Sequence, residues 1–427
     1  LTITARAILI IEMRTIGLET FLPCTALLSV FLDMKYSNAN IPRAFRLKYI
    51  KVLCLKSIFI FLILSCGYGS ENAIELNKSK AVDTKILAAP FLVGAERTRQ
   101  YLPALEGKKV GIVGNQSSLI ENTHLVDSLV TLGIDVRRVF SPEHGFRGTA
   151  DAGEKVENRI DSKTQLPIIS LYGKNRKPNK EQLKGIEIMV FDLQDVGVRF
   201  YTYISTLHNV MEACAEAGIS LLILDRPNPN GYYIDGPILE MKHASFVGMH
   251  PVPVVHGMTV GEYAQMINGE GWLANNVKCN ITVVKVKGYT HQTKYSLPVK
   301  PSPNLPNDIA INLYPSLCFF EGTFLSAGRG TDMQFQIFGA PSLPSERYSF
   351  QFTPQANDGA TYPKFKSKEC FGRDLRATPK LDKLNLEWIV GAYVTSEKKK
   401  TCFDDFIKKL AKSNKLQEGI KKGYTYR

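Results

Sequence analysis

The sequence predicts an α/β protein in which a mostly parallel sheet is followed by a smaller mixed α+β region. Two observations lead to this prediction. Short apolar runs alternate with stretches of helical periodicity between residues 109 and 224. Beyond residue 256 the pattern changes to one helix, one alternating strand at 281–287 and a proline-rich loop at 298–306. At 427 residues, 44% of them hydrophobic, the chain is long enough for two domains with separate cores.

The predicted strands are short, and each is followed by a polar turn. They cover residues 109–113, 136–140, 167–171, 187–192 and 220–224. A helix is predicted over 123–132, with Leu125, Leu129 and Leu132 on one face, and another from about residue 204 to a stop at Gly218. Repeated strand-helix units of this kind build a parallel sheet covered on both faces, so the first domain is predicted to be Rossmann-like.

Polar side chains follow the predicted strands where each one ends. The carboxyl ends of parallel strands meet at one edge of a sheet, and ligands of open α/β sheets bind outside that edge. We therefore expect one site there, formed by Asn115, Gln116, Glu143, His144, Asp192, Asp195, Asp225, Arg226 and Asn228.

The most reactive of these turns is Ser-Pro-Glu-His-Gly-Phe-Arg-Gly at residues 141–148. Glu143, His144 and Arg147 place a carboxylate, an imidazole and a guanidinium within five residues. Pro142 fixes φ at the entry of the turn, and the two glycines permit conformations that a side chain would forbid. The search for a catalytic site therefore starts at Glu143.

The second region contributes a cluster of its own. Glu321 lies in Phe-Glu-Gly-Thr at 320–323, Arg329 follows in Gly-Arg-Gly-Thr at 328–331, and Asn304 lies in the proline-rich loop. We expect this cluster to face the strand ends, with the active site in a cleft between the two domains.

Nucleotide and metal chemistry are not expected. The Gly111-Ile-Val-Gly114 turn lacks the GxGxxG spacing, no GxxxxGK[ST] loop occurs, and the seven histidines show no HExxH pattern. Eight cysteines without a CxxC pair argue against a zinc ribbon and a disulfide scaffold. The prediction is an enzyme without cofactor.

The amino-terminal segment is predicted to be an export signal. Residues 34–65 hold six basic residues and no acidic one, with an apolar run at 58–64 that ends in Ser65-Cys66. This resembles a bacterial lipobox, which would make Cys66 a lipidated first residue; an ordinary cleaved signal is the alternative. The predicted organisation is an upstream extension that is not native (1–33), a signal peptide (34–66), a tether (67–85), the Rossmann-like domain (86–255) and the C-terminal domain (256–427). A membrane segment at 21–32 is the alternative for the extension.

The formal net charge of +13 comes mostly from the two ends of the chain. Residues 1–65 carry eight basic and three acidic side chains, and residues 398–427 carry ten basic and three acidic ones. No aromatic-interleaved basic motif accompanies them, so the C-terminal segment is interpreted as a solvated helix face, and no nucleic-acid partner is expected.

Six motifs in order carry a resemblance to a known family. They are SPEHGFRG (141–148), DLQDVGVRFYTY (192–203), DRPNPNG (225–231), HGMTVGE (256–262), SPN (302–304) and FEGT with GRGTD (320–332). Over about residues 88–423 the chain resembles the exo-β-N-acetylmuramidases of the NamZ type, formerly a domain of unknown function. The resemblance implies a secreted or periplasmic glycosidase, and the lipobox adds an anchor in a bacterial envelope membrane as an expectation. It would remove N-acetylmuramic acid from the non-reducing ends of peptidoglycan fragments.

The chain departs from the family pattern in two places. Met333-Gln334 stands where the family more often has Thr-Pro, and the sequence stops at Tyr424-Thr-Tyr-Arg427 where relatives usually continue. We expect a truncated or altered C-terminal domain, with an effect on stability more than on chemistry.

Glycoside cleavage needs an acid for the leaving oxygen and a second group that assists the sugar centre or activates water. Glu143, beside His144, is the predicted acid; the second group is Asp192, Asp195 or Glu321, with Glu321 favoured. Substrate contacts are expected from Arg199, Arg226 or Arg329 to the lactyl carboxylate, and from Tyr201 and Tyr203 to the sugar. His256 is interpreted as structural.

Two other classes of function stay open. A secreted protein that binds wall sugars without cleaving them would use the same cleft. An esterase or amidase would need an activated nucleophile; no GxSxG elbow or SxxK motif occurs, which leaves only Ser141.

Overall fold

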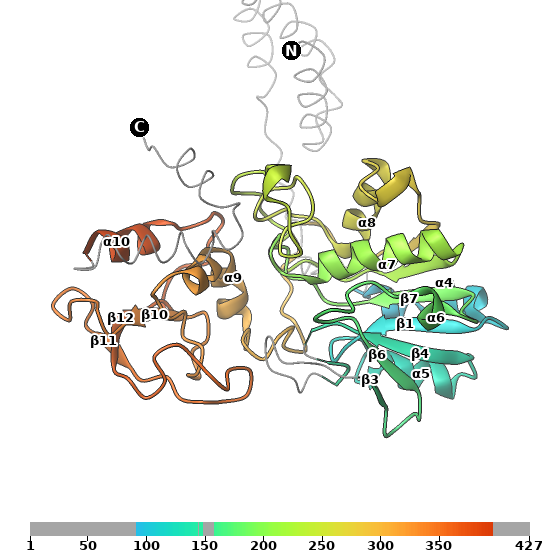
Figure 1. Ribbon diagram of the computed structural model, residues 1–427, viewed down its shortest axis with the longest axis horizontal. Helices are drawn as coiled ribbons and strands as arrows, with labels where there is room; N and C mark the ends of the chain where they lie inside the picture. Colours follow the sequence, from blue (N-terminus) through green and yellow to red (C-terminus); the bar gives the residue numbers. More distant parts are fainter. Residues whose placement is uncertain (1–90, 144, 148–157, 396–427) are drawn as a thin grey trace, which may run out of the picture. The chain divides into compact units, whose positions relative to one another are not determined.

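The computed structural model describes residues 91–143, 145–147 and 158–395 (Figure 1). They belong to one compact unit that extends from Lys85 to Arg427. The predicted extension, the signal peptide with Cys66, the tether, His144 and the basic C-terminal segment lie outside the described residues.

A seven-stranded sheet organises the first part of this unit, in the order β5-β6-β4-β1-β7-β8-β9. Figure 1 labels its strands β6, β4, β1 and β7. Its strands are β1 (Val110–Gly114), β4 (Val136–Ser141), β5 (Arg159–Ile160), β6 (Pro167–Ser170), β7 (Ile188–Asp192), β8 (Ser220–Leu224) and β9 (Ile281–Val284). All pairs are parallel except β5 with β6. The order of the parallel strands is that of a Rossmann sheet, with its reversal between β1 and β7. The predicted fold class is therefore confirmed.

Helices lie on both faces of this sheet because successive strand residues point to opposite sides. On β7, Val190 packs with helices α4 (Thr98–Leu105) and α5 (Leu125–Thr131). Its neighbours Met189 and Phe191 pack instead with α6 (Lys180–Leu183), α7 (Tyr203–Ala217) and α8 (Val260–Gly269). Burial on both faces explains why the central strands β1, β7 and β8 are mostly apolar rather than alternating.

The predicted helices form, with one difference in extent. Helix α7 ends at Gly218, whose φ of +67° gives the left-handed cap that was expected. Helix α5 is shorter than predicted, because Thr123–His124 (β3) pairs with Leu119–Ile120 (β2) and His124 caps the helix. Leu132 lies past the last turn and is 56% exposed, so its predicted place on the buried face is wrong.

The sheet extends beyond the predicted domain boundary at residue 255. Strand β9 pairs in parallel with β8 along Leu221–Leu224, so the α8-β9 unit continues the Rossmann pattern. The prediction placed this strand in the second domain, because β9 is short and only half-buried and its sequence does not reveal its partner.

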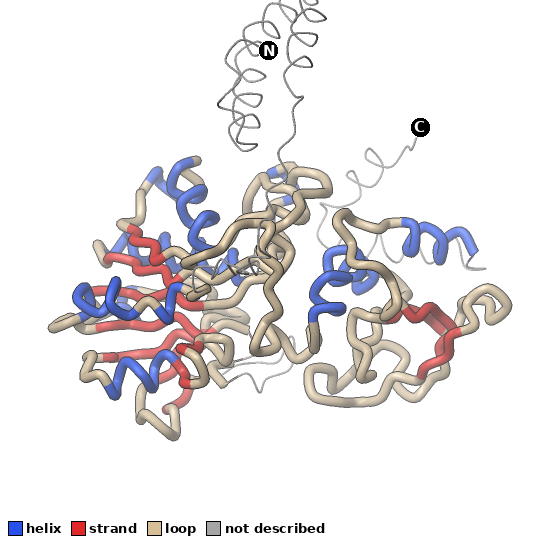
Figure 2. Tube along the Cα trace, turned by 180° about the vertical axis from the view of Figure 1, so that it is seen from behind, coloured by secondary structure: helices blue, strands red, loops and turns tan. Residues whose placement is uncertain are grey.

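The remaining region contains helices and a small sheet, which Figure 2 shows in blue and red. Its strands are antiparallel and lie in the order β10-β12-β11. The strands are β10 (Ile337–Ala340), β11 (Phe350–Phe352) and β12 (Cys370–Asp374). The helices are α9 (Asp308–Leu317) and α10 (Glu387–Thr395); the short 3-10 turns of the chain are η1 (Gly94–Glu96), η2 (Met241–His243), η3 (Ala274–Asn276) and η4 (Cys318–Gly322). One buried cluster contains side chains of both regions, from Val113 to Ala392.

Candidate active site

The ends of four strands bring the predicted polar residues to one edge of the sheet. Val113 of β1 is in register with Phe140 of β4, and Gly114 with Asp192 of β7. The residues that follow β4, β1, β7 and β8 therefore lie next to one another, around the point where the strand order reverses.

Glu143 lies in the turn after β4 and is partly exposed. The hydroxyl of Tyr172, just past the end of β6, donates a hydrogen bond to its carboxyl group. Burial, followed by the charge of Glu143, raises the pKa of Tyr172 to about 12. Tyr203 also lies close enough for the Glu143 charge to add to the rise that burial causes in its pKa. The turn contains Gly145 at φ +75°, a conformation that favours glycine.

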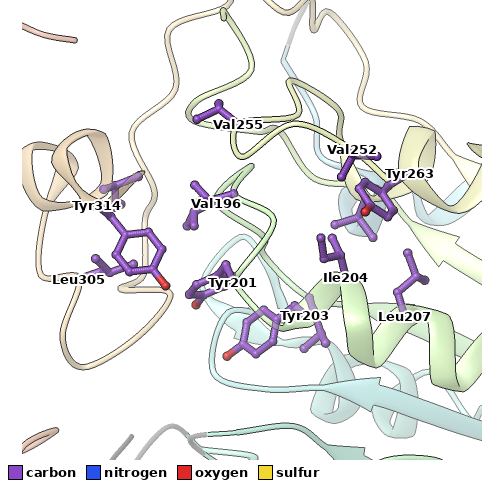
Figure 3. Close-up of a cluster of buried hydrophobic side chains, with 14 of the residues drawn as sticks. Val196, Tyr201, Tyr203, Ile204, Leu207, Val252, Val255, Tyr263, Leu305 and Tyr314 are labelled. Carbon is purple, nitrogen blue, oxygen red and sulfur yellow. The ribbon is translucent and has the colours of Figure 1, made fainter. Parts of the chain in front are cut away.

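Asn115 links the end of β1 to the start of α7. Its amide donates to the Tyr203 hydroxyl at 2.8 Å, while its Oδ1 accepts from the N–H and hydroxyl of Ser117. The rings of Tyr201 and Tyr203 meet edge to face, with centroids 4.9 Å apart (Figure 3). Both rings are at least 92% buried, so they offer hydroxyls rather than an open stacking face for a sugar.

The proline-rich loop is tied to these strand ends through its main chain. The Tyr201 hydroxyl donates to the Pro301 carbonyl at 2.7 Å, and the Gln116 amide donates to the Lys300 and Pro301 carbonyls at 3.2 and 3.3 Å. Asn304 in the same loop donates to the Gly359 carbonyl at 2.8 Å. Residues far apart in sequence are thereby brought to the edge that carries Glu143.

Asp192 and Arg226 satisfy each other in the interior. Arg226 Nε and Nη2 donate to the two Asp192 carboxylate oxygens at 2.5 and 2.9 Å, and Nη2 also donates to the Leu119 carbonyl. Both residues are at least 96% buried. This bidentate pair holds β7 and β8 together at their ends.

Asp195 is also buried, behind the tyrosine pair. Its Oδ2 accepts from the Gly197 N–H at 2.6 Å, and burial raises its pKa to about 7. His256 Nε2 lies 3.7 Å from the same oxygen, and burial lowers the pKa of His256 to about 3. A buried neutral histidine whose Nδ1 accepts from the Met258 N–H fits the structural role predicted for it.

Asp225 and Asn228 organise the start of α8. Asp225 accepts from the Thr259 hydroxyl and the Gly261 N–H, each at 2.8 Å, and burial raises its pKa to about 6. Asn228 donates to the Met258 carbonyl at 2.9 Å. The Asp225 carboxyl group therefore ties the end of β8 to the first turn of α8.

Arg147 pairs with Asp161 at 2.8 Å and with Asp127 at 3.3 Å, and lies over the Phe146 ring. It lines a polar hollow of about 360 Å³ together with Gln116, Leu119, Asn122, Thr123, His124, Asp127 and Lys163. Its guanidinium therefore ties the turn that follows Glu143 to Asp127 and Asp161, and it contributes a cation to the hollow.

Glu321 and Arg329 form a partly exposed ion pair in the second region. Arg329 Nε lies 2.5 Å from Glu321 Oε1, and the two side chains are 27% and 35% exposed. The guanidinium also lies over the Phe335 ring, 5.3 Å from its centroid. Arg199, by contrast, donates to the Pro237 and Val252 carbonyls.

Burial separates the four predicted catalytic carboxyl groups into two kinds. Asp192 and Asp195 are enclosed, whereas Glu143 and Glu321 keep partial exposure. Tyr172 was not predicted, although its place after β6 satisfies the same strand-end rule. The Pro301 carbonyl could not have been found, because a main-chain acceptor has no residue-type signal.

Within the described ranges, no three His, Cys, Asp or Glu side chains are arranged to hold a metal ion. Over the same part of the chain, every helix is too short or too polar to cross a membrane.

A partly exposed carboxyl group that a tyrosine hydroxyl contacts, at the strand ends of an open α/β sheet, is suited to a hydrolase that works by acid and base. Two solved DUF1343 family proteins from Bacteroides fragilis NCTC 9343 are similar in structure. One matches with a TM-score of 0.70 and 44% identity, over 79% of this chain and 92% of that one. The other matches with a TM-score of 0.64 and 27% identity, over 79% of this chain and 99% of that one.

The chain belongs to the exo-β-N-acetylmuramidase NamZ family. The family's N-terminal model matches residues 110–309 and its C-terminal model residues 312–427. The peptidoglycan β-N-acetylmuramidase NamZ of Bacillus subtilis (strain 168) is 45% identical over 299 residues, which are 68% of this chain and 71% of that protein.

Proposed function

We propose that this chain is a glycoside hydrolase that releases N-acetylmuramic acid from the non-reducing ends of peptidoglycan fragments. The family and the named Bacillus subtilis relative support an exo-acting muramidase. The observation that carries the chemistry is the partly exposed carboxyl group of Glu143, which Tyr172 orients at the strand-end edge. No structural observation favours the binding-only or the esterase alternative; the Ser141 hydroxyl, for example, is fully buried.

Glu143 is the proposed general acid, which protonates the leaving glycosidic oxygen. Glu321 is the proposed second group, because Asp192 and Asp195 are enclosed by the protein. Arg329 is the proposed partner of the lactyl carboxylate, since it keeps 27% exposure while Arg226 is enclosed with Asp192 and Arg199 is engaged with two carbonyls.

The proposed location is the bacterial envelope. Export through the signal at 34–66, with lipidation of Cys66, would place the enzyme where peptidoglycan fragments are found. Labelling of the expressed protein with a fatty-acid analogue, compared with Cys66→Ser, tests the anchor; equal labelling of both would contradict it.

The function is tested by product analysis with a disaccharide that carries N-acetylmuramic acid at its non-reducing end. We expect the parent protein to release the free sugar, and Glu143→Gln to lose about 10²- to 10⁴-fold in kcat, as for removal of a general acid. Glu187→Gln is the matched control, because Glu187 lies before β7, at the other edge of the sheet, and caps only the Lys109 N–H.

No release by a folded parent protein would refute the proposed function. Parental rates in Glu143→Gln would leave the function standing and remove Glu143 as its acid.

A further inference from the structure

We propose that Lys364 is a positioning residue that holds the turn of Glu321 by closing a ring of main-chain carbonyl groups with its ammonium group. The proposal rests on the proposed function only for the role of Glu321 in catalysis. The ring itself is a property of the fold.

Four carbonyl oxygens converge on the Lys364 ammonium. Lys364 Nζ lies 3.2 Å from the Phe320 carbonyl oxygen, 2.8 Å from that of Glu321, 2.7 Å from that of Thr323 and 3.1 Å from that of Leu325. An ammonium group has three hydrogens, so these four acceptors share them. Main-chain dipoles therefore contribute negative potential around this charge.

The position of the ring explains why a cation is needed there. Helix α9 continues without a break into η4, and the carbonyls at the end of such a run lack the full set of intrahelical partners; that of Phe320 accepts from the Thr323 N–H at 2.9 Å and the Thr323 hydroxyl at 2.8 Å as well as from Lys364. They also carry the negative end of the helix dipole. The Lys364 ammonium donates to these carbonyls and places a positive charge at the negative end of the dipole. It does so at Glu321, whose side chain is the proposed second catalytic group.

The same short segment also fixes the partner of Glu321. Pro363 packs against Gly330, where an added Cβ would lie 2.5 Å from Pro363 Cγ. Gly330 has a φ of +80°, as has Gly328, so Arg329 lies between two positions that favour glycine. Pro363 and Lys364 thus hold the Arg329 loop and the Glu321 turn against each other, and the 2.5 Å ion pair joins the two.

A ring of four carbonyl oxygens is a cation site that the protein fills with its own side chain. If Lys364 is shortened, the oxygens remain and attract a small monovalent cation. Ammonium reproduces the lost head group, and potassium is a cation that rings of main-chain carbonyls bind. Tetramethylammonium has no N–H group and is too large for the ring of carbonyl oxygens, so it cannot take the place of ammonium or potassium.

The test compares Lys364→Met with the parent protein in ammonium, potassium or tetramethylammonium chloride at equal ionic strength. In tetramethylammonium we expect kcat to fall roughly 100-fold, the loss typical of a catalytic group displaced by about 1 Å. Ammonium and potassium should restore part of it and raise the thermal midpoint of the variant. Lys366→Met is the matched control: Lys366 lies two residues on, over the Tyr362 ring, and its loss should respond to no cation.

Three results would overturn the proposal: parental kcat in Lys364→Met, a loss of kcat that is the same in all three salts, or equal cation effects on the control. If Lys364→Met folds poorly, the yield of folded protein in ammonium against tetramethylammonium carries the test, and equal yields refute the ring. Because the thermal midpoint and the yield need no substrate, they remain decisive even if the parent releases no N-acetylmuramic acid.

Discussion

At the scale of single residues, burial decides what each charged group does. Asp192 and Arg226 carry the same kinds of charge as Glu143 and Arg329. The first two are enclosed and satisfy each other, whereas the others keep contact with solvent. A charge that is fully paired in the interior stabilises a loop junction and is not available to a ligand.

The enclosed pair should be costly to break. Arg226→Met leaves the Asp192 carboxylate without its partner, and we expect a loss of about 3 to 5 kcal/mol in the free energy of unfolding, measured with urea. Arg137→Met removes a half-exposed partner of Asp135 and should change little. Equal effects of the two substitutions would contradict a structural role for the Asp192–Arg226 pair.

The hydrogen bond from Tyr172 should matter for rate rather than for stability. Hydrogen bonds to charged groups contribute about 1.5 to 3 kcal/mol, so Tyr172→Phe should lower kcat by a factor of about 10 to 100 with little change in KM. Tyr362→Phe, at an 89% exposed position, is the control. A change in KM alone would show that Tyr172 binds substrate instead of orienting Glu143.

At the scale of elements, a histidine network joins α7 to the following chain. His208 Nδ1 of α7 lies 2.9 Å from His250 Nε2, and His250 Nδ1 lies 3.1 Å from the Tyr263 hydroxyl of α8. Glu212, which is paired with Lys177, lies 3.7 Å from His208. Burial lowers the pKa of His208, and lowers that of His250 to about 3, so both rings are neutral in the folded protein.

This network predicts a fold that weakens in acid. Burial lowers the pKa of two further histidines, that of His256 to about 3 and that of His124 to about 4. With His208 and His250, four buried histidines have a lowered pKa. Between pH 6.5 and about 4 these histidines are protonated in the unfolded chain but stay neutral in the folded protein. The free energy of unfolding therefore decreases as the pH is lowered. The raised pKa values of Asp195 and Asp225 act the other way, because the folded protein keeps protons that the unfolded chain releases between about pH 4 and 7.

Burial also raises the pKa of Asp192, so four histidines are opposed by three aspartates, and we expect a net loss of about 1 kcal/mol per pH unit from pH 6 to pH 4. Urea unfolding at several pH values measures it. His250→Gln should flatten the dependence, while His291→Gln, at an exposed position, should not. A stability that is constant or rises on acidification would refute this account.

At the scale of the whole described unit, the sheet and the C-terminal region share their interior. The Asn230 amide donates to the Ile311 carbonyl at 3.1 Å, and Asp235 Oδ2 accepts from the Leu384 N–H at 2.7 Å. Tyr314 of α9 packs edge to face against Tyr201 (Figure 3). Buried hydrophobic side chains of both regions belong to one cluster.

We therefore expect the two regions to unfold together. The chain has only two tryptophans, Trp272 before β9 and Trp388 in α10, so Trp388→Phe and Trp272→Phe each leave one fluorescent probe. Their urea transitions should coincide, and Tyr314→Ala should shift both by the same amount. Two separate transitions, or a shift in only one, would show that the regions fold independently.

The sequence by itself determined the strands, the long helix with its Gly218 cap, and the edge at which polar residues gather. These are local properties, because periodicity and cap residues act within a few positions. Its six motifs also indicated the family. The extent of α5 and the partner of β9 were missed, since both depend on pairing with other segments.

Only the tertiary structure decided which polar residues are open to a ligand. Arg226 meets Asp192 from 34 positions away, Gln116 meets Lys300 from 184, and Lys364 meets the Glu321 turn from 43. Whether a carboxylate or an arginine is enclosed depends on such distant partners. The chain's residue types and spacing fix the candidates for the chemistry, and the long-range packing selects among them, because solvent exposure is a property of the folded surface.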